Sequence, residues 1–273
     1  MECIEIKSPD GLSLNSYYWA AKKPKAIMTL MHGFGEHAGR YDHFAQHLNS
    51  HGISVLAPDL HGHGKTEGKR GLVKSYDLFR GDVKAALLES QKRNPDIPHI
   101  LFGHSMGGGI VLDHGLGEPV CELAAIIASA PLIKLAEPAP KPLEFVVRVL
   151  SKIAPNATMK NPIDGTKISR VTEEQDAYLS DTLNHGTMGF GLVVGLVDTG
   201  QAALDNCDKW TTPLLLLHAR EDRLTAFSAS EAFAAGAQNC TFVPFENCEH
   251  EMHNDTTRDE FYKAVTDFIE ARI

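Results

Sequence analysis

The sequence predicts an α/β fold in which a mostly parallel central sheet carries helices on both faces and a helical cap is inserted between two strands. Short apolar runs alternate along the chain with longer segments of helical periodicity, and strands that are separated by helices normally run parallel. The alternation stops at Pro131 and resumes near Pro213. One strand-to-helix junction carries the turn Gly103-His104-Ser105-Met106-Gly107.

The expected strands follow from apolar runs bounded by turn residues. Cys3–Lys7 and Leu12–Trp19 alternate in polarity and flank Pro9-Asp10-Gly11, which predicts an opening hairpin. The later runs are continuous, as in strands buried on both faces. They are Ala26–Met31, Ile53–Ala57, Ile100–Phe102, Leu123–Ser129, Leu214–His218 and Thr241–Phe245.

The segments between these strands have helical periodicity, which predicts that they form helices. On Ser75–Arg93, the longest of them, one face gathers apolar residues, namely Leu78, Phe79, Val83, Ala86 and Leu87. The other expected helices are Tyr41–His51, the segment that follows Gly107, Ser228–Ala237 and Thr257–Arg272.

Residues 131–207 form the expected cap, and residues 1–130 with 208–273 form the expected core. Apolar residues at helical spacing predict that Leu143–Ile153 either packs on the core or lines an acyl tunnel whose lip touches lipid. A second apolar run covers Met188–Val197. The glycines nearby, which are Gly186, Gly189, Gly191, Gly195 and Gly200, predict a loosened and mobile lid.

Composition narrows the class of protein. The 273 residues carry a formal net charge of −9 at pH 7, with no basic stripe, which argues against nucleic-acid binding. The five cysteines are scattered without C-x-x-C spacing, so we expect reduced thiols and a cytoplasmic protein. The start of the chain lacks the features of a signal peptide, and no apolar stretch approaches the ~20 residues that span a membrane.

The turn around Ser105 has the G-x-S-x-G pattern of a nucleophile elbow. A serine acts as a nucleophile when its hydroxyl stands clear of the backbone, close to a base and to N–H groups that stabilise an oxyanion. A strained corner between a strand and a helix provides these conditions, but its crowded backbone requires glycine at the flanking positions. The sequence therefore predicts Ser105 as a catalytic nucleophile.

Position in the chain selects the acid and the base. In folds with such an elbow the order is serine, acid, histidine, with the last two in loops that follow strands. Asp222 follows the strand Leu214–His218, and His250 follows Thr241–Phe245. The residues alone leave Glu221 as a competing acid and His253 as a competing base.

Two backbone N–H groups are expected to form an oxyanion hole. One belongs to Met106, the residue after the serine, and the other to Phe34 within His32-Gly33-Phe34-Gly35. Glycines on both sides of Phe34 would let this loop fold inward.

Over nearly its whole length, the chain resembles the monoacylglycerol lipase and lysophospholipase-like branch of the α/β-hydrolases. The resemblance rests on several strings of residues, which are His32-Gly33-Phe34-Gly35-Glu36-His37 with Arg40-Tyr41, Asp59-Leu60-His61-Gly62-His63-Gly64, the serine motif, Tyr178-Leu179-Ser180-Asp181, Glu221-Asp222-Arg223-Leu224 and His250-Glu251-Met252-His253. It implies the α/β-hydrolase fold. It also implies Asp222 as the acid and His250 as the base.

The resemblance further implies that polar side chains bind a glycerol head group near the His32–Gly35 loop. The residues are Glu36, Arg40, Tyr178 and His253; Glu36 and Arg40 could equally tie the loop down. The chain departs from the family pattern at Asp255, where glutamate is usual, and at His61, where arginine is common.

Together these observations predict a serine esterase that cleaves monoacylglycerols through an acyl-enzyme on Ser105, with no metal or organic cofactor. The expected partner is a small lipid ester, with transient contact between the cap and lipid surfaces. A lysophospholipase, thioesterase or general carboxylesterase would use the same residues, and a non-catalytic binding protein on a hydrolase fold is a third possibility.

Overall fold

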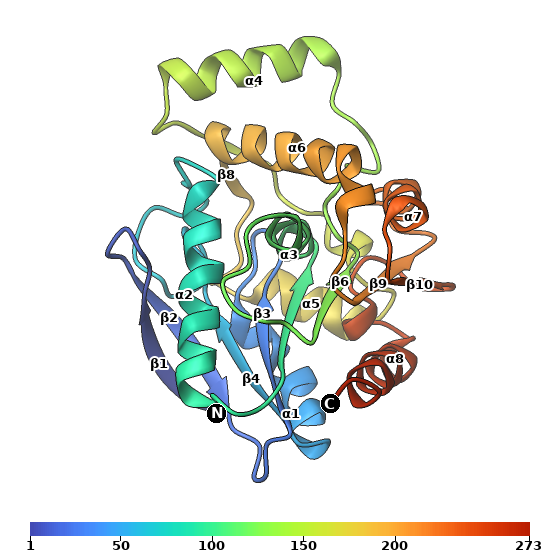
Figure 1. The fold of residues 1–273 in the computed structure, drawn as a ribbon. Coiled ribbons are helices and arrows are strands. Elements are labelled where there is room, and N and C mark those ends of the chain that lie inside the picture. The colour runs from blue at the N-terminus through green and yellow to red at the C-terminus, as the bar shows by residue number, and fades with distance from the viewer.

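The computed structural model describes residues 1–273, and its centre is an eight-stranded sheet with the strand order β1-β2-β4-β3-β5-β6-β9-β10 (Figure 1). The strands β1 and β2 pair antiparallel, as do β2 and β4, and every other neighbouring pair is parallel. Their bounds are β1 Glu2–Lys7, β2 Ser13–Trp19, β3 Ala26–Met31, β4 Ile53–Pro58, β5 His99–His104, β6 Ala125–Ser129, β9 Leu214–Ala219 and β10 Cys240–Phe245. The expected mostly parallel α/β sheet is confirmed.

Helices cover both faces of the sheet and enclose two separate apolar layers (Figure 1). One layer lies under α1 (Asp42–Ser50) and α8 (Arg258–Glu270), where the rings of Phe44 and Phe261 are 5.7 Å apart. The other lies under α2 (Asp77–Arg93), α3 (Met106–Leu116) and α7 (Phe227–Gly236). Because β3, β5, β6 and β9 bury all their residues, their sequences read as continuous apolar runs.

The insertion, which is the chain between β6 and β9, carries three α-helices and two short strands. The helices are α4 (Lys141–Ile153), α5 (Thr172–Ser180) and α6 (Phe190–Asp205). The strands β7 (Thr158–Lys160) and β8 (Thr187–Gly189) pair antiparallel and form a separate two-stranded sheet. The sequence gives no sign of this two-stranded sheet, because each strand has only three residues and lacks a period-two pattern.

Two glycines of α6 allow close packing on the core, and the mobile lid stays a prediction. A Cβ on Gly195 would lie 2.8 Å from Cβ of Tyr76, and one on Gly200 would lie 2.1 Å from the carbonyl oxygen of Ile133. The backbone of α6 therefore rests directly on the core at both positions. Larger side chains would force the helix away.

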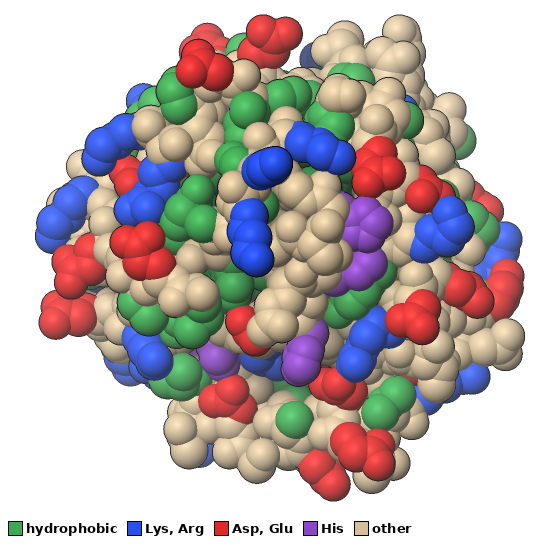
Figure 2. Space-filling view, turned by 90° about the horizontal axis from the view of Figure 1, so that it is seen from below, with side chains coloured by type: hydrophobic (Ala, Val, Ile, Leu, Met, Phe, Trp, Pro, Cys, Tyr) green, Lys and Arg blue, Asp and Glu red, His purple; other side chains and the backbone are tan.

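The helix α4 packs on α6 at the far end of the molecule from α1 and α8 (Figure 1). Only Val147 of α4 is fully buried, and five apolar side chains of this helix are exposed, namely Leu143, Phe145, Val146, Val149 and Ile153. On the opposite side of the molecule, seen from below, acidic and basic side chains interrupt the apolar ones (Figure 2). No helix combines the length and the hydrophobicity needed to cross a bilayer.

All five cysteines are free thiols in the fold. Cys248, two residues before His250, is fully buried. Burial raises the pKa of the Cys248 thiol to about 11, so the thiol stays protonated near neutral pH.

Candidate active site

Ser105 lies at the sharp turn between β5 and α3. Its backbone has φ 54° and ψ −115°, a conformation that residues other than glycine rarely adopt. The Ser105 N–H donates to the carbonyl of Ser129 at 2.9 Å, and the Ser105 carbonyl accepts the N–H groups of Gly109 and Leu132. A fixed and strained backbone thus carries the half-buried hydroxyl.

Crowding around this turn requires its glycines. A Cβ on Gly103 would lie 2.1 Å from the carbonyl oxygen of Gly107, and a Cβ on Gly107 would lie 2.1 Å from that of Met31. Carbon and oxygen atoms cannot approach so closely, so only glycine fits at either position.

The strand register brings three loops to one edge of the sheet. His104, the last residue of β5, pairs with Ser129 of β6, and Ser129 pairs with Leu217 of β9. Next to it, Ala219 of β9 pairs with Phe245 of β10. The turn after β5 and the loops after β9 and β10 therefore begin side by side at the carboxyl edge, where α/β folds build their sites.

Asp222 and His250 meet at this edge. Nδ1 of His250 lies 2.6 Å from Oδ2 of Asp222, and both side chains are buried. Glu221, the competing acid, points instead to the surface, where it pairs with Arg170. Of the neighbouring carboxylates of Glu221 and Asp222, only that of Asp222 contacts His250.

His253, the competing base, lies beside His250 but contacts no carboxylate. Its ring stacks on Tyr41 with the centroids 5.0 Å apart, and neither ring nitrogen has a hydrogen-bond partner. Burial lowers the pKa of His253 to about 4, so the ring is neutral near pH 7.

The buried pair of Asp222 and His250 shifts both pKa values. Burial disfavours the charged form of Asp222, but the charge of His250 and hydrogen bonds from His218 and His250 outweigh it and hold the Asp222 pKa well below its usual range. Burial also disfavours the imidazolium of His250, but the attraction of Asp222 outweighs it and raises the His250 pKa. The pair therefore stabilises a positive charge on His250.

His250 lies next to the turn that carries Ser105. The ring of His104, the residue before the serine, is 4.7 Å from the ring of His250 between centroids. The Ser105 hydroxyl and His250 are not joined by a hydrogen bond in this structure, whereas Asp222 and His250 are. Hydrogen bonds between a nucleophile and its base are often long until substrate binds.

The His32–Gly35 loop lies against Ser105. A Cβ on Gly33 would be 3.3 Å from Cβ of Ser105. His32 fixes the loop, because its Nε2 accepts the N–H of Leu60 at 3.0 Å while its Nδ1 donates to the Gly33 carbonyl at 2.7 Å. The N–H of Phe34 has no acceptor in the protein, and the N–H of Met106 opens α3, where no intrahelical acceptor exists.

A buried charge cluster supports this loop from behind. Glu36 accepts the N–H of Gly33 at 2.6 Å and the hydroxyl of Tyr41 at 2.7 Å. Arg40 donates to Glu36 at 2.5 Å and forms a two-bonded pair with Glu251 at 2.7 and 2.8 Å. The attraction of Arg40, working against burial, lowers the pKa of Glu251 to about 2. The carboxylate of Glu36 and the guanidinium of Arg40 are thus engaged within the protein.

Tyr178, from α5, covers this cluster. The Arg40 guanidinium lies 4.9 Å from the centre of the Tyr178 ring, a cation–π contact. The Tyr178 hydroxyl makes no hydrogen bond and lies 3.6 Å from the point where Gly35 would carry a Cβ. Of the four residues expected at a head group, Tyr178 and His253 keep unpartnered polar atoms, whereas Glu36 and Arg40 do not.

Some residues of the site carry no signal that sequence reasoning could use. His218 contacts Asp222, and His185 contacts the His32–Gly35 loop, yet both are single histidines among fourteen. Glu251 lies inside the string His250-Glu251-Met252-His253, but nothing in the sequence pairs it with Arg40, because the two lie far apart along the chain.

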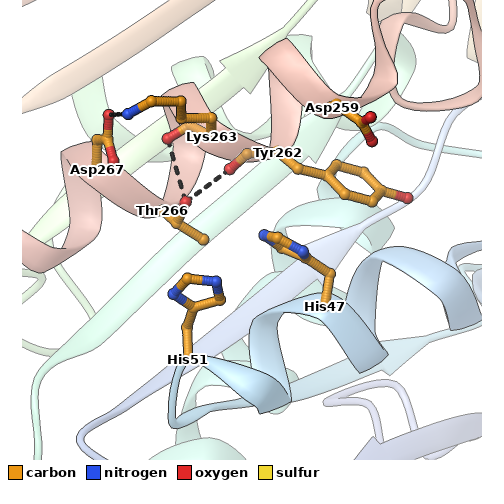
Figure 3. A pocket seen from close by; sticks show the side chains of 7 residues that line it. All are labelled: His47, His51, Asp259, Tyr262, Lys263, Thr266 and Asp267. Atoms are coloured by element: carbon orange, nitrogen blue, oxygen red, sulfur yellow. Dashed lines mark hydrogen bonds and ion pairs between the residues drawn. The ribbon is translucent and has the colours of Figure 1, made fainter.

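A separate polar cleft of about 390 Å³ lies between α1 and α8, away from the strand ends that carry Ser105 (Figure 3). His47 comes from α1, His51 directly follows the last residue of α1, and the remaining residues come from α8 (Figure 3). These are Asp259, Tyr262, Lys263, Thr266 and Asp267. None of the residues expected in the active site lines this cleft.

Known proteins share the sequence pattern and the fold of this chain. The Hydrolase_4 family model, described as serine aminopeptidase, S33, matches residues 22–257. A monoacylglycerol lipase of Mycolicibacterium smegmatis is 32% identical over 249 residues, which cover 90% of this chain and 88% of the relative. An uncharacterized abhydrolase domain-containing protein of Dictyostelium discoideum is 32% identical over 98% of this chain, which spans 29% of that longer relative.

A solved structure shows the same fold. The crystal structure of Paleococcus ferrophilus monoacylglycerol lipase superposes with a TM-score of 0.85 at 27% identity and covers 95% of this chain and 99% of the other.

Proposed function

This chain is a serine hydrolase that belongs to the Hydrolase_4 family, and we propose that it cleaves monoacylglycerols to a fatty acid and glycerol. The observation that carries the proposal is the buried pair of Asp222 and His250, 2.6 Å apart at the strand edge where Ser105 occupies the strained turn. The substrate class comes from the relatives, two of which are named monoacylglycerol lipases.

The reaction would proceed in two acyl transfers. Ser105 Oγ attacks the ester carbonyl carbon while Nε2 of His250 takes the hydroxyl proton, and Asp222 stabilises the resulting imidazolium. The N–H groups of Phe34 and Met106 would hold the oxyanion. The bond to glycerol then breaks, and the leaving oxygen takes the proton from His250.

Water completes the cycle. It attacks the acyl carbon on Ser105 while His250 takes one of its protons. The bond to Ser105 Oγ then breaks, Oγ takes the proton from His250, and the free fatty acid leaves. Each step returns the charge on His250 to its starting value. The chain's own residues supply every proton transfer in this scheme.

The four head-group residues divide into two roles. We propose that Tyr178 and His253 contact the glycerol hydroxyls, because their polar atoms lack partners. Glu36 and Arg40 would instead hold the His32–Gly35 loop, because their charged groups are already paired. A dihydroxy head group needs such donors and acceptors within an otherwise apolar pocket.

We further propose that residues 131–207 act as a cap that delivers the substrate from lipid. The exposed apolar side chains of α4 point away from the core and would rest on a lipid surface. We place the enzyme in the cytoplasm, where its five free thiols would stay reduced.

The test is a substrate panel with a matched active-site variant. Purified protein is assayed on 2-oleoylglycerol, lysophosphatidylcholine and oleoyl-CoA, together with Ser105→Ala and labelling by a fluorophosphonate probe. We expect fastest turnover of 2-oleoylglycerol, labelling at Ser105, and loss of nearly all turnover in Ser105→Ala. Faster turnover of lysophosphatidylcholine or oleoyl-CoA would replace the proposed substrate class, and absence of labelling would favour a binding protein.

A further inference from the structure

A second histidine contacts the same carboxylate oxygen of Asp222 as His250. His218 is the penultimate residue of β9, and its side chain is completely buried. Its Nε2 lies 3.1 Å from Oδ2 of Asp222, and its Nδ1 lies 2.7 Å from Oγ of Ser230 in α7. No part of the proposed reaction uses this residue.

The neighbours of His218 define which nitrogen carries the proton. Nε2 faces acceptors, which are the Asp222 carboxylate and the Thr225 carbonyl oxygen at 3.3 Å. It must therefore carry a hydrogen, which it donates to the Thr225 carbonyl oxygen, with Oδ2 of Asp222 3.1 Å from the same nitrogen. Nδ1 then accepts the hydroxyl hydrogen of Ser230, and this bond keeps the ring in that tautomer.

Donors surround both oxygens of Asp222. Oδ1 accepts the N–H groups of Leu224 at 2.7 Å and Thr225 at 3.0 Å. Oδ2 accepts His250 Nδ1–H at 2.6 Å and the Thr225 hydroxyl at 2.8 Å, and Nε2 of His218 lies 3.1 Å from it. His218 and His250 thus share one carboxylate oxygen.

We propose that His218, oriented by Ser230, is a positioning residue that aims Oδ2 of Asp222 at His250 and limits how much of the carboxylate's charge His250 receives. The inference rests on the proposed function, because it assigns His218 a role through the base of that reaction. Charge donated to a second imidazole is charge withheld from the first. His218 therefore tunes the proton affinity of His250.

The other groups that surround His250 and His218 stay the same when His218 is substituted. The charges of Glu251 and Glu36 also act on His250, and the buried rings of His104 and His253 lie near it. His218 contacts the charged group of Asp222, together with Ser230, Thr225 and the Phe227 ring, 5.7 Å away between centroids. The Arg220 guanidinium lies 4.7 Å from the centre of that Phe227 ring. Substituting His218 changes the contacts of Asp222 and leaves the other charges near His250 in place.

The experiment compares His218→Leu, which removes the donor, with His218→Gln, whose amide can still donate to Asp222. His99→Leu is the matched control, because His99 is another buried imidazole on a sheet strand, at the opposite end of β5 from Ser105. Each variant is assayed on a soluble p-nitrophenyl ester between about pH 5 and 9, with active sites counted by fluorophosphonate titration.

In His218→Leu we expect kcat to fall about tenfold with KM within about twofold, and the acid limb of kcat/KM to move to higher pH. The sign follows because Oδ2, relieved of one donor, holds the imidazolium of His250 more strongly. His218→Gln should restore most of kcat and return the acid limb of kcat/KM to its wild-type pH. His99→Leu should change neither, although it lowers thermal stability.

Proton NMR of the His250 Nδ1 hydrogen gives a readout that needs no turnover. An unchanged titration midpoint for this hydrogen in His218→Leu would overturn the inference, even if kcat fell. If His218→Leu does not fold, Ser230→Ala takes its place, because it keeps the His218 ring but no longer fixes its tautomer. The titration midpoint of His250 should still rise in Ser230→Ala. An unchanged midpoint in this variant would overturn the inference equally. If the wild-type protein hydrolyses no ester, the proposed function fails, while the NMR titration still decides whether His218 tunes His250.

Discussion

The carbonyl oxygen of Gly35 accepts a hydrogen bond from the N–H of His185 at 2.8 Å, and this bond ties the insertion to the loop beside Ser105. Two further contacts reinforce it. The ring of His185 meets the Phe34 ring edge-on with centroids 5.8 Å apart, and Asp181 pairs with His37 at 2.8 Å. The insertion therefore supports the residue whose N–H we assign to the oxyanion hole.

Gly35→Ala should break this support. Gly35 has φ +72°, and a Cβ there would lie 2.3 Å from the carbonyl oxygen of His185, so the loop and the insertion must separate. We expect kcat on a p-nitrophenyl ester to fall by roughly 100-fold, as for loss of an oxyanion donor. Gly11→Ala is the matched control, because Gly11 has φ +94° but open space around its Cβ position. A kcat in Gly35→Ala equal to that of the control would contradict the assignment.

Arg40→Met should destabilise the fold through the two carboxylates that it leaves buried. Glu36 and Glu251 would each lose their only guanidinium partner, and removing one member of a buried ion pair costs about 3–5 kcal/mol. Urea denaturation at neutral pH measures the loss. For comparison, Arg220→Met breaks an exposed pair with Glu246 and should cost less than about 1 kcal/mol. Equal losses in the two variants would show that the Arg40 cluster does not hold the fold.

Tyr178→Phe separates head-group binding from loop support. The change removes the unpartnered hydroxyl but keeps the ring that covers Arg40. We expect the KM for 2-oleoylglycerol to rise about tenfold, since a hydrogen bond to the head group is lost. The KM for p-nitrophenyl butyrate, which has no glycerol, should stay unchanged. A parallel rise on both substrates would indicate a structural role for the hydroxyl.

The pH profile should report the raised pKa of His250. The base works only when neutral, and because its pKa is raised by Asp222 the protonated form persists above the ordinary imidazole value of about 6.5. The acid limb of kcat/KM should therefore lie above that pH. Asp222→Asn removes the attraction and the correct tautomer, so we expect kcat to fall roughly 10⁴-fold. A wild-type limb below pH ~6 would contradict the geometry.

The exposed face of α4 should govern binding to lipid. Phe145→Ser with Ile153→Ser removes the two most exposed apolar side chains of this helix. Burying each of them in a membrane would contribute about 1.5–3 kcal/mol to the binding free energy. We expect at least about tenfold weaker binding to phosphatidylcholine vesicles in a sedimentation assay, with unchanged rates on a soluble ester. Leu88→Ser, on the exposed side of α2, is the control. Vesicle binding that does not change would assign the face to another partner.

Much of the core was predictable, because a strand that is buried on both faces appears in the sequence as a continuous apolar run. Ala26–Met31 was expected and observed with identical bounds, and the hairpin of β1 and β2 follows its turn residues. The insertion was harder to predict. The strands β7 and β8 are too short to show a period, and the glycines of α6 have their role only because Tyr76 and Ile133 approach them from distant parts of the chain.

By itself, the sequence determined the alternation of strands and helices, the strained turn at Ser105, and the loops in which an acid and a base should follow, because each depends on residues that are neighbours along the chain. The resemblance to a family favours Asp222 and His250, but only the tertiary structure shows these two side chains in contact. It turns Asp222 toward His250 and sends Glu221 to Arg170 at the surface. It also places His218 against Asp222 and Arg40 between two carboxylates. These contacts join side chains from different strands and loops, and no local pattern encodes them; packing and the desolvation of charges select them when the sheet edge forms.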